Sequence, residues 1–480
     1  MTDVFLVQLP SPAFKNVFRE WAGGMGTGLR SSRPYPGHDQ KYYDIPFSSL
    51  LYIAADLRNR RIEFAYRDLQ GEERFAADAF FADLAAQKPK VLVSVVNFPS
   101  FTSDMELLAR TREIVPGIKI LLLGATAKWS KAKILASGQA DIVMEEAEEL
   151  LVGANIAALL TAQSEEALQG CSVPGKEAVR IMPVRTPMKD LNFIDFPAYD
   201  LLDFSKYVSD HYFGQRARYM TVFTTKGCPY NCNYCPYPFG FGERIIYRAP
   251  ERVGADIERL VRSYGIEQIL FRDQVFTLNK KHARAVCQEI IRRKLPIRWI
   301  CETRYDLLDE PLLDLMYESG CGEIHFGLES ADQTLFASTA KPDGPKSLDL
   351  FRETIDLVKR RGINCHVHMI VGMPDENWTT VRNSIRWLRE ARPHSVQFAY
   401  FMPYPGTPIF EELRRSGELG DVGAIDWEAL GGFDQPVLPT RHLSVAEVRK
   451  ACERMGVEWQ FTLGDRIKLK AQRMLGRVPA

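Results

Sequence analysis

The sequence lacks a long apolar run, a surplus of either charge and a paired set of cysteines. No stretch approaches the roughly 20 apolar residues of a membrane-spanning helix. Lysine plus arginine equals aspartate plus glutamate, at 61 each, which argues against a general nucleic-acid or membrane binder. The start, MTDVFLVQLPSP, has an acidic residue before a short apolar run and no small-residue cleavage site, which indicates a strand rather than a signal peptide. These features predict a soluble, cytoplasmic protein.

The nine cysteines are an odd number, and most of them are scattered. This usage fits a reducing compartment with free thiols and not a disulfide framework. Three cysteines lie within eight positions, at Cys228, Cys232 and Cys235 in the stretch TTKGCPYNCNYCPYPFG. We interpret the other six as small core side chains: Cys171, Cys287, Cys301, Cys321, Cys365 and Cys452.

Residues 1–165 alternate short apolar runs with amphipathic helical segments. This alternation predicts an α/β fold with a Rossmann-like, doubly wound parallel sheet, whose ligands bind beyond the carboxyl ends of the strands. A long glycine-rich connection follows the first strand, and such connections are uncommon unless functional. Its glycine spacing does not fit a dinucleotide fingerprint. The predicted strands are 4–9, 62–67, 91–96, 119–124 and 141–144, and the clearest helices are 47–58 and 104–114.

Residues 166–220 show little regular patterning and are interpreted as a connector. A second series of strands and helices over 221–429 predicts six βα units, that is, an open or partial TIM-type barrel with its site at the carboxyl ends of the strands. Residues 430–480 form a helical region that is basic towards its end, interpreted as a solvated surface helix, with a partner or membrane contact as the alternative. The predicted barrel strands are 221–226, 267–271, 297–302, 323–328, 365–371 and 395–401, and the helices are 250–263, 281–293, 310–319, 347–361 and 378–391.

The C-x3-C-x2-C run after the first barrel strand places three thiolates on one tight loop. A structural zinc ion or an electron-transfer cluster requires a fourth ligand. No other cysteine or histidine stands at ligand spacing, because His211, the nearest, lies across the first strand. Three ligands on a cluster of four irons leave one iron open to bind and reduce a substrate or cofactor.

With this motif in this place, residues 221–410 resemble the radical S-adenosylmethionine (SAM) superfamily. In that family the open iron is chelated by the amino and carboxylate groups of SAM, and the reduced cluster cleaves SAM to a 5'-deoxyadenosyl radical. The resemblance implies a 4Fe-4S cluster on Cys228, Cys232 and Cys235, bound SAM, a small-molecule substrate, and an electron donor such as flavodoxin or ferredoxin. No nucleic-acid partner is expected.

The resemblance also implies contacts to SAM. Asp273, at the end of the second barrel strand, corresponds to a position that contacts the SAM amino group, and a carboxylate suits an ammonium. Arg304 has the planar fork that suits the SAM carboxylate, with a structural salt bridge as the alternative. The other implied contacts are Tyr234 beside adenine, Glu302 at the end of the third strand, and Glu329 and Ser330 at the ribose or methionine moiety. Residues of the loops that shape the adenine pocket and barrel rim are Gly372, Pro374, Pro405, Gly406 and Thr407.

Residues 1–165 resemble the cobalamin-binding domain that precedes many radical SAM barrels. Two features depart from that pattern. The D-x-H-x-x-G motif is absent, and His38 is the only histidine within residues 1–165. The usual Gly-Glu-Gly-Glu turn is replaced by Glu145-Glu146-Ala147-Glu148, and alanine tolerates positive φ poorly. The alternative is a domain that only packs on the barrel or supports the substrate. The cofactor contacts implied at the strand ends are Ser94, Asn97, Gly124, Ala125 and Thr126, with Lys128 and Trp129 nearby.

We therefore expect a cobalamin-dependent radical SAM methyltransferase that methylates an unactivated carbon, or phosphorus, of a small molecule. No catalytic side chain is identified. The alternatives are a cyclase, oxidase or ring-rearranging enzyme on the same scaffold, and a non-catalytic iron–sulfur or cobalamin carrier. A methylthiotransferase is excluded because it needs three further cysteines in the amino-terminal domain, whereas the first cysteine of this chain, Cys171, comes after residues 1–165. Three barrel-strand histidines are interpreted as structural, with substrate binding or catalysis as the alternative: His325, His366 and His368.

Overall fold

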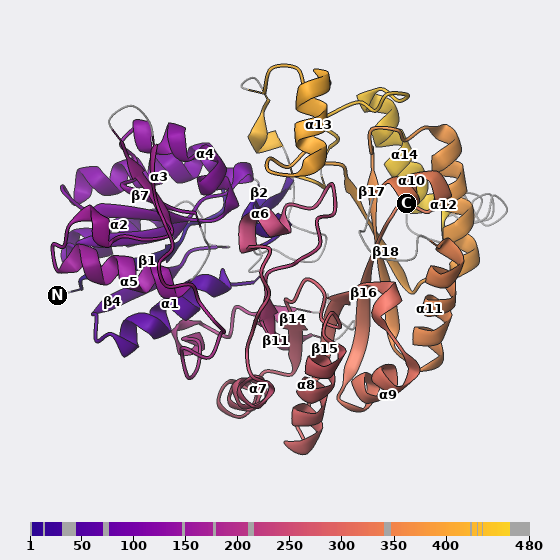
Figure 1. Cartoon of the computed structure of the whole chain (residues 1–480), viewed down its shortest axis with the longest axis horizontal. Coiled ribbons are helices and arrows are strands. Elements are labelled where there is room, and N and C mark those ends of the chain that lie inside the picture. Colours follow the sequence, from indigo (N-terminus) through magenta and orange to yellow (C-terminus); the bar gives the residue numbers. More distant parts are fainter. Residues whose placement is uncertain are drawn as a thin grey trace, which may run out of the picture.

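The computed structural model describes residues 2–12, 15–30, 45–70, 76–145, 149–175, 179–209, 216–339, 347–422, 425–429, 431–433 and 435–460. The chain folds into two halves, each built around a seven-stranded sheet (Figure 1). In the described part of the chain, no helix is both long enough and apolar enough to cross a bilayer.

The first sheet has the order β4-β1-β5-β6-β7-β8-β9. Its first five strands are parallel and confirm the predicted doubly wound sheet, while β8 and β9 add an antiparallel edge. These two edge strands lie in the segment interpreted as a connector. They escaped prediction because they are short, and β9 exposes its central residues instead of forming an apolar run. The bounds are β1 (Val4–Gln8), β4 (Phe64–Asp68), β5 (Val91–Val95), β6 (Lys119–Leu123), β7 (Ile142–Met144), β8 (Cys171–Pro174) and β9 (Val179–Met182).

Helices cover both faces of this sheet because alternate strand residues are apolar on both sides. One face packs against α1 (Ser48–Asn59) and α5 (Glu149–Leu160). The other face packs against α2 (Ala76–Gln87), α3 (Phe101–Ile114) and α4 (Ala125–Ala136). The first strand is followed by the hairpin of β2 (Lys15–Phe18) and β3 (Thr27–Arg30), joined through the short helix η1 (Ala22–Gly24).

The second sheet has the order β10-β11-β14-β15-β16-β17-β18, with six parallel strands after the antiparallel edge strand β10. Its two edge strands do not pair with each other in the described residues, so the barrel is open as predicted. The predicted first strand, 221–226, is misplaced: β11 ends at Val222, and the chain turns before the short strand β12. The bounds are β10 (Val208–Ser209), β11 (Ala217–Val222), β12 (Thr225–Lys226), β13 (Ile246–Tyr247), β14 (Gln268–Phe271), β15 (Arg298–Thr303), β16 (Cys321–Glu329), β17 (Asn364–Val371) and β18 (Ser395–Tyr400).

The barrel helices lie on the outer, convex side of the curved sheet (Figure 1). Their ends follow from local sequence: the Asp309 carboxylate accepts from the amide of Leu312 at 2.9 Å to begin α9, and Asn377 forms a capping box at the start of α12. The carboxyl-terminal helix α14 (Val445–Glu458) packs against the last two strands and α12. The bounds are α7 (Pro250–Tyr264), α8 (Lys280–Arg292), α9 (Glu310–Glu318), α11 (Leu348–Arg360) and α12 (Trp378–Ala391).

Candidate active site

The three clustered cysteines lie on the loop between β12 and α6 (Tyr237–Phe241), where the two halves meet. All three are free thiols, and the amide of Cys235 donates to the carbonyl of Cys232 at 3.1 Å. Burial raises the pKa of the Cys228 thiol, and for Cys235 the two other sulfurs add to the effect of burial. One of these thiols is buried and the other two are partly buried, and neighbouring thiols in such a setting need a cation to become thiolates. This donor set therefore fits an iron–sulfur cluster.

Asp273 fixes the entry to the cysteine loop. The side chain is 1% exposed and accepts from the hydroxyl of Thr224 at 2.9 Å and its amide at 3.2 Å, and also from the hydroxyl and amide of Thr225. Burial raises the pKa of Asp273 to about 6. The contacts thus tie the end of β14 to the turn before the cysteines, which is a positioning role. Its implied contact with the SAM amino group stays a prediction.

Tyr234 and Glu329 lie beside the cysteines. The Tyr234 hydroxyl donates to the Glu329 carboxylate at 2.7 Å. Burial raises the pKa of Tyr234 well above its usual range, and the charges of Glu329, Cys232 and Cys235 add to that effect. Glu329 has a φ of 66° at the irregularity where β16 pairs with β17. A non-glycine residue in this region is uncommon, and such conformations cluster at functional sites.

Arg304 forms a salt bridge with Asp306 beside the cysteine loop. Two of its N–H groups donate to Asp306, at 3.0 and 2.8 Å, and its guanidinium lies 4.3 Å from the centre of the Tyr230 ring in the cysteine loop. The structure therefore shows the salt bridge that the sequence left as the alternative. The other two implied contacts also have protein partners: Glu302 accepts from Arg272 at 3.4 Å, and the Ser330 hydroxyl accepts from the amide of Asp332 at 3.3 Å.

Arg272 is a site residue that sequence reasoning missed. It is 7% exposed and donates to the Tyr237 hydroxyl at 3.1 Å, next to the third cysteine. Its guanidinium lies 5.6 Å from the centre of the Trp21 ring and 3.9 Å from Glu20 in the first half. The sequence did contain a signal for this residue, because Arg272 is a charged residue that directly follows the apolar strand β14 and precedes Asp273.

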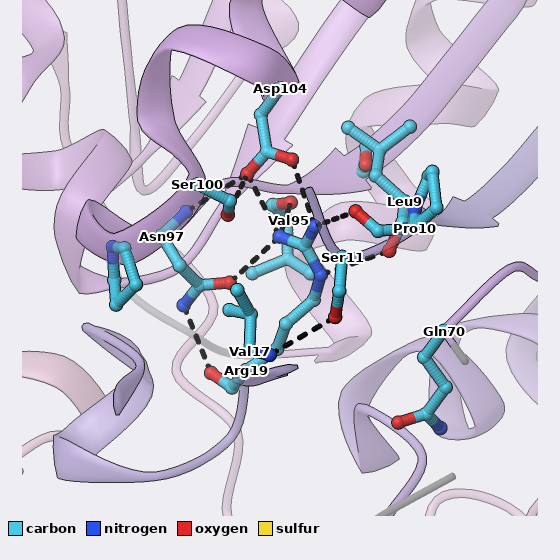
Figure 2. Close-up of polar contacts among 12 residues, drawn as sticks. Leu9, Pro10, Ser11, Val17, Arg19, Gln70, Val95, Asn97, Ser100 and Asp104 are labelled. Atoms are coloured by element: carbon cyan, nitrogen blue, oxygen red, sulfur yellow. Dashed lines mark hydrogen bonds and ion pairs between the residues drawn. The ribbon is translucent and has the colours of Figure 1, made fainter. Parts of the chain in front are cut away.

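On the other side of the loop, a buried network anchors the segment that begins at Arg19 (Figure 2). The Arg19 guanidinium is 2% exposed and makes two 2.8 Å bonds to Asp104. It also donates to Asn97 at 3.0 Å and to the carbonyls of Leu9 and Pro10 at 3.1 and 3.0 Å. These contacts fix the segment over the carboxyl ends of β1 and β5.

Four of the five strand-end residues implied for cobalamin lie against residues 19–26, and the fifth, Ser94, is bonded to β1. Asn97 donates to the carbonyls of Arg19 and Gly24 at 3.0 and 2.9 Å, and Thr126 donates to the carbonyl of Met25 at 3.2 Å. Ser94 is fully buried and donates to the carbonyl of Val7 on β1 at 3.0 Å, while Gly124 and Ala125 adjoin Gly24. These residues therefore do not form an open corrin surface. The turn residues 146–148, His38 and His211 lie outside the described residues.

The halves meet through polar and aromatic contacts around the cysteine loop. Lys226, just before the loop, pairs with Glu149 on α5, and both side chains are 4% exposed. Lys128 donates to the carbonyl of Phe239 at 3.2 Å, and Trp129 packs edge-on against Phe410 with ring centres 5.3 Å apart. A cavity of about 640 Å³ remains between the halves, lined among others by Lys128, Lys226, Cys235, Phe239, Arg244 and Gly406.

Residues 222–388 match the radical SAM superfamily. The barrel is a radical SAM domain. An uncharacterized methyltransferase of Pyrococcus horikoshii is 27% identical over 431 residues, covering 88% of this chain and 89% of the relative. The anaerobic magnesium-protoporphyrin IX monomethyl ester cyclase of Rubrivivax gelatinosus is 26% identical over 347 residues, covering 70% of this chain and 60% of the cyclase. The cytidylyl-2-hydroxyethylphosphonate methyltransferase of Streptomyces wedmorensis is 27% identical over 255 residues, 51% of this chain and 47% of that enzyme.

Two solved structures share the arrangement of both halves. The radical SAM methyltransferase TsrM from Kitasatospora setae, solved with cobalamin and a 4Fe-4S cluster bound, has a TM-score of 0.67 at 17% identity, covering 87% of this chain and 76% of its own. The cobalamin-dependent SAM radical enzyme OxsB, solved with aqua-cobalamin and SAM, has a TM-score of 0.73 at 15% identity, covering 99% of this chain and 71% of its own. The chain therefore shares the fold of these two enzymes, both of which were solved with cobalamin bound.

Proposed function

We propose that the protein is a radical SAM methyltransferase that adds a methyl group to an unactivated carbon, or to phosphorus, of a small molecule. The observation that carries the proposal is the loop of three free cysteines that follows the first strands of the open barrel, in a chain similar to a methyltransferase along nearly the full length of both. An unactivated carbon offers no acidic proton to a base, so a cofactor must supply the difficult chemistry. A bound cluster supplies one-electron reduction of SAM.

The chain's own residues hold and enclose that chemistry. Cys228, Cys232 and Cys235 hold iron, and Asp273 fixes the strand end from which their loop begins. Tyr234 and Glu329 form the polar edge beside the cysteines and are the residues we assign to SAM. The open barrel interior admits the substrate. An external electron donor supplies the electron that the cluster passes to SAM.

Cobalamin as the methyl carrier rests on the fold shared with TsrM and OxsB. The strand-end residues implied for it do not support that role as they stand, because residues 19–26 cover them. No transfer step is therefore assigned to cobalt. The cavity beside Cys235 is the space we assign to a second cofactor or to the substrate.

The test is anaerobic purification and cluster reconstitution, followed by iron and cobalamin analysis against the variant Cys228→Ala/Cys232→Ala/Cys235→Ala. About four irons per chain that are lost in the variant, with methyl transfer from labelled SAM to a product, support the proposal. Roughly one cobalamin per chain, retained in the variant, adds cobalt as the methyl carrier. Iron without cobalamin removes cobalt from the proposal. Absence of 5'-deoxyadenosine under strong reduction overturns the enzyme assignment and favours a carrier.

A cyclase is the second candidate, favoured by the similarity to the magnesium-protoporphyrin ester cyclase over 70% of this chain. Both reactions begin with the same radical, so 5'-deoxyadenosine does not separate them. A product that keeps the substrate's carbon count and carries no label from SAM would establish the cyclase.

A further inference from the structure

Three histidines converge on the inner face of the barrel. His325 lies on β16, and His366 and His368 lie on β17. Successive strand residues point to opposite faces. The residues between and beside these histidines are buried against the outer helices, whereas the histidines themselves are only partly buried. Their rings therefore face the open interior of the barrel and do not fill its helical shell.

The spacing of the rings suits one shared ion. One ring nitrogen from each of the three histidines lies within 4.8 Å of the others. The ring centres are 4.5 Å apart for His325 and His366, 4.7 Å for His366 and His368, and 5.3 Å for His325 and His368. His368 pairs across the sheet with Gly327, which has no side chain to separate the rings. A neutral imidazole offers one nitrogen lone pair to a metal ion, so three converging rings supply three ligands.

Neighbouring polar groups orient two of the three rings. Glu323 accepts or shares a hydrogen with Nε2 of His325 at 2.6 Å, and the Ser395 hydroxyl contacts Nδ1 of His366 at 2.6 Å. A metal-binding histidine commonly uses its second nitrogen in this way, and a carboxylate partner raises the basicity of the ligating nitrogen. Histidines that only pack in a core have no need for ring nitrogens that converge or for rings that face the open interior of the barrel.

We propose that His325, His366 and His368 bind one divalent transition-metal ion of the Zn²⁺ class, with a further coordination position open to the barrel interior. Three histidines plus an exchangeable ligand form a recurrent metal arrangement. Along β16, His325 precedes Glu329 by four residues, or about 13 Å of strand. The ion thus lies deeper along the strand than Glu329, which pairs with Tyr234 of the cysteine loop. That the open position takes an oxygen or nitrogen donor of the substrate rests on the proposed function.

Cobalt(II) is the probe, added to the reconstituted holoenzyme and followed by its visible absorption and by metal analysis. We expect the cobalt content to rise by about one ion per chain above the content measured before cobalt(II) is added, so that cobalt already present as cobalamin is subtracted, with the intense absorption of a low-coordinate site. The variants His366→Ala/His368→Ala and the size-conserving His366→Gln/His368→Gln should each weaken binding by at least about tenfold, and Glu323→Gln by about tenfold through loss of orientation. His442→Ala, which alters an exposed histidine outside the cluster, is the control.

The variants must retain the iron content of the parent, which shows that the barrel is folded. No cobalt uptake, or uptake that the histidine variants leave unchanged, overturns the site. Cobalt uptake that disappears in Cys228→Ala/Cys232→Ala/Cys235→Ala also overturns it, because the ion then lies on the cysteines. Cobalt binding is measured without SAM turnover. Loss of methyl transfer with the histidine site intact would therefore count against the proposed function and not against the metal.

Discussion

The buried pair between Arg19 and Asp104 should be among the most destabilising contacts of the first half to break. The guanidinium is anchored on one side by Asp104 and on the other by the carbonyls of Leu9 and Pro10 (Figure 2). The two side chains are 1% and 0% exposed. Water cannot replace the missing partner, so Asp104→Ala leaves a buried cation without its counterion.

The expected loss of unfolding free energy in Asp104→Ala follows from the burial of the pair. Removing one member of a buried ion pair costs about 3–5 kcal/mol, because the remaining charge stays desolvated. The matched control is Asp200→Ala, which breaks a pair with Arg58 of similar geometry, at 2.8 and 2.6 Å, whose side chains are 44% and 35% exposed. Partly exposed pairs contribute about 0–1 kcal/mol. The double variant Arg19→Met/Asp104→Leu should recover part of the loss, since it removes both charges together.

The assay is denaturant unfolding of each variant combined with hydrogen exchange resolved to peptides over residues 15–30 and 91–97. Asp104→Ala should lower the unfolding free energy of the first half and speed exchange in both peptides, with the barrel peptides unchanged. An Asp104→Ala variant that costs no more than Asp200→Ala would refute the reasoning. The same holds for a double variant whose loss equals the sum of the losses in Arg19→Met and Asp104→Leu, since the pair would then not be coupled.

Three further changes test the barrel and its contact with the first half. Burial raises the pKa of Glu376 from 4.5 to about 7, so its stabilisation is full below pH 4.5 and is lost as the pH rises through 7. Glu376→Gln should remove about 3 kcal/mol of this pH dependence, measured by unfolding across that range. Gly240→Ala should cost about 1–3 kcal/mol in a thermal melt, because the added carbon would lie 1.8 Å from the carbonyl of Gly23. Tyr234→Phe leaves Glu329 one donor short, which should weaken SAM binding in equilibrium dialysis by about 1–3 kcal/mol without loss of iron.

Much of the fold could be predicted because burial on both faces leaves a strong periodic signal. The predicted helices 378–391 and 281–293 differ from α12 and α8 by at most one residue at either end. Strands β8 and β9 give no such signal, because both have only four residues and β9, at the edge of the sheet, tolerates exposed residues. The first barrel strand was misplaced for another reason: β11 begins at Ala217, before the predicted start, and Thr224 and Thr225 have strand-forming side chains that turn instead to bind Asp273.

In the site, too, the features set by the local sequence could be predicted and those set by long-range contacts could not. The cysteines are recognisable because a single loop carries all three. The partner of Arg304 is only two residues away, yet nothing in the pattern favours Asp306 over a SAM carboxylate, since both are planar acceptors. Residues 19–26 lie over the strand ends through contacts such as the hydrogen bond from Asn97 to the carbonyl of Arg19. These two residues are 78 positions apart, and no periodicity in the sequence predicts such a contact.

The long-range contact between residues 19–26 and the strand ends bears most directly on where cobalamin could bind. The fold is shared with enzymes solved with cobalamin, but residues 19–26 are hydrogen-bonded to the strand ends where the sequence implied the corrin contacts. Asn97 and Thr126 cannot serve the segment and a corrin at once. If cobalamin binds at the strand ends, its addition must lower the hydrogen-exchange protection of 19–26, and Asp104→Ala must speed its uptake. If cobalamin binds and that protection is unchanged, the corrin lies elsewhere, with the cavity beside Cys235 as the space available.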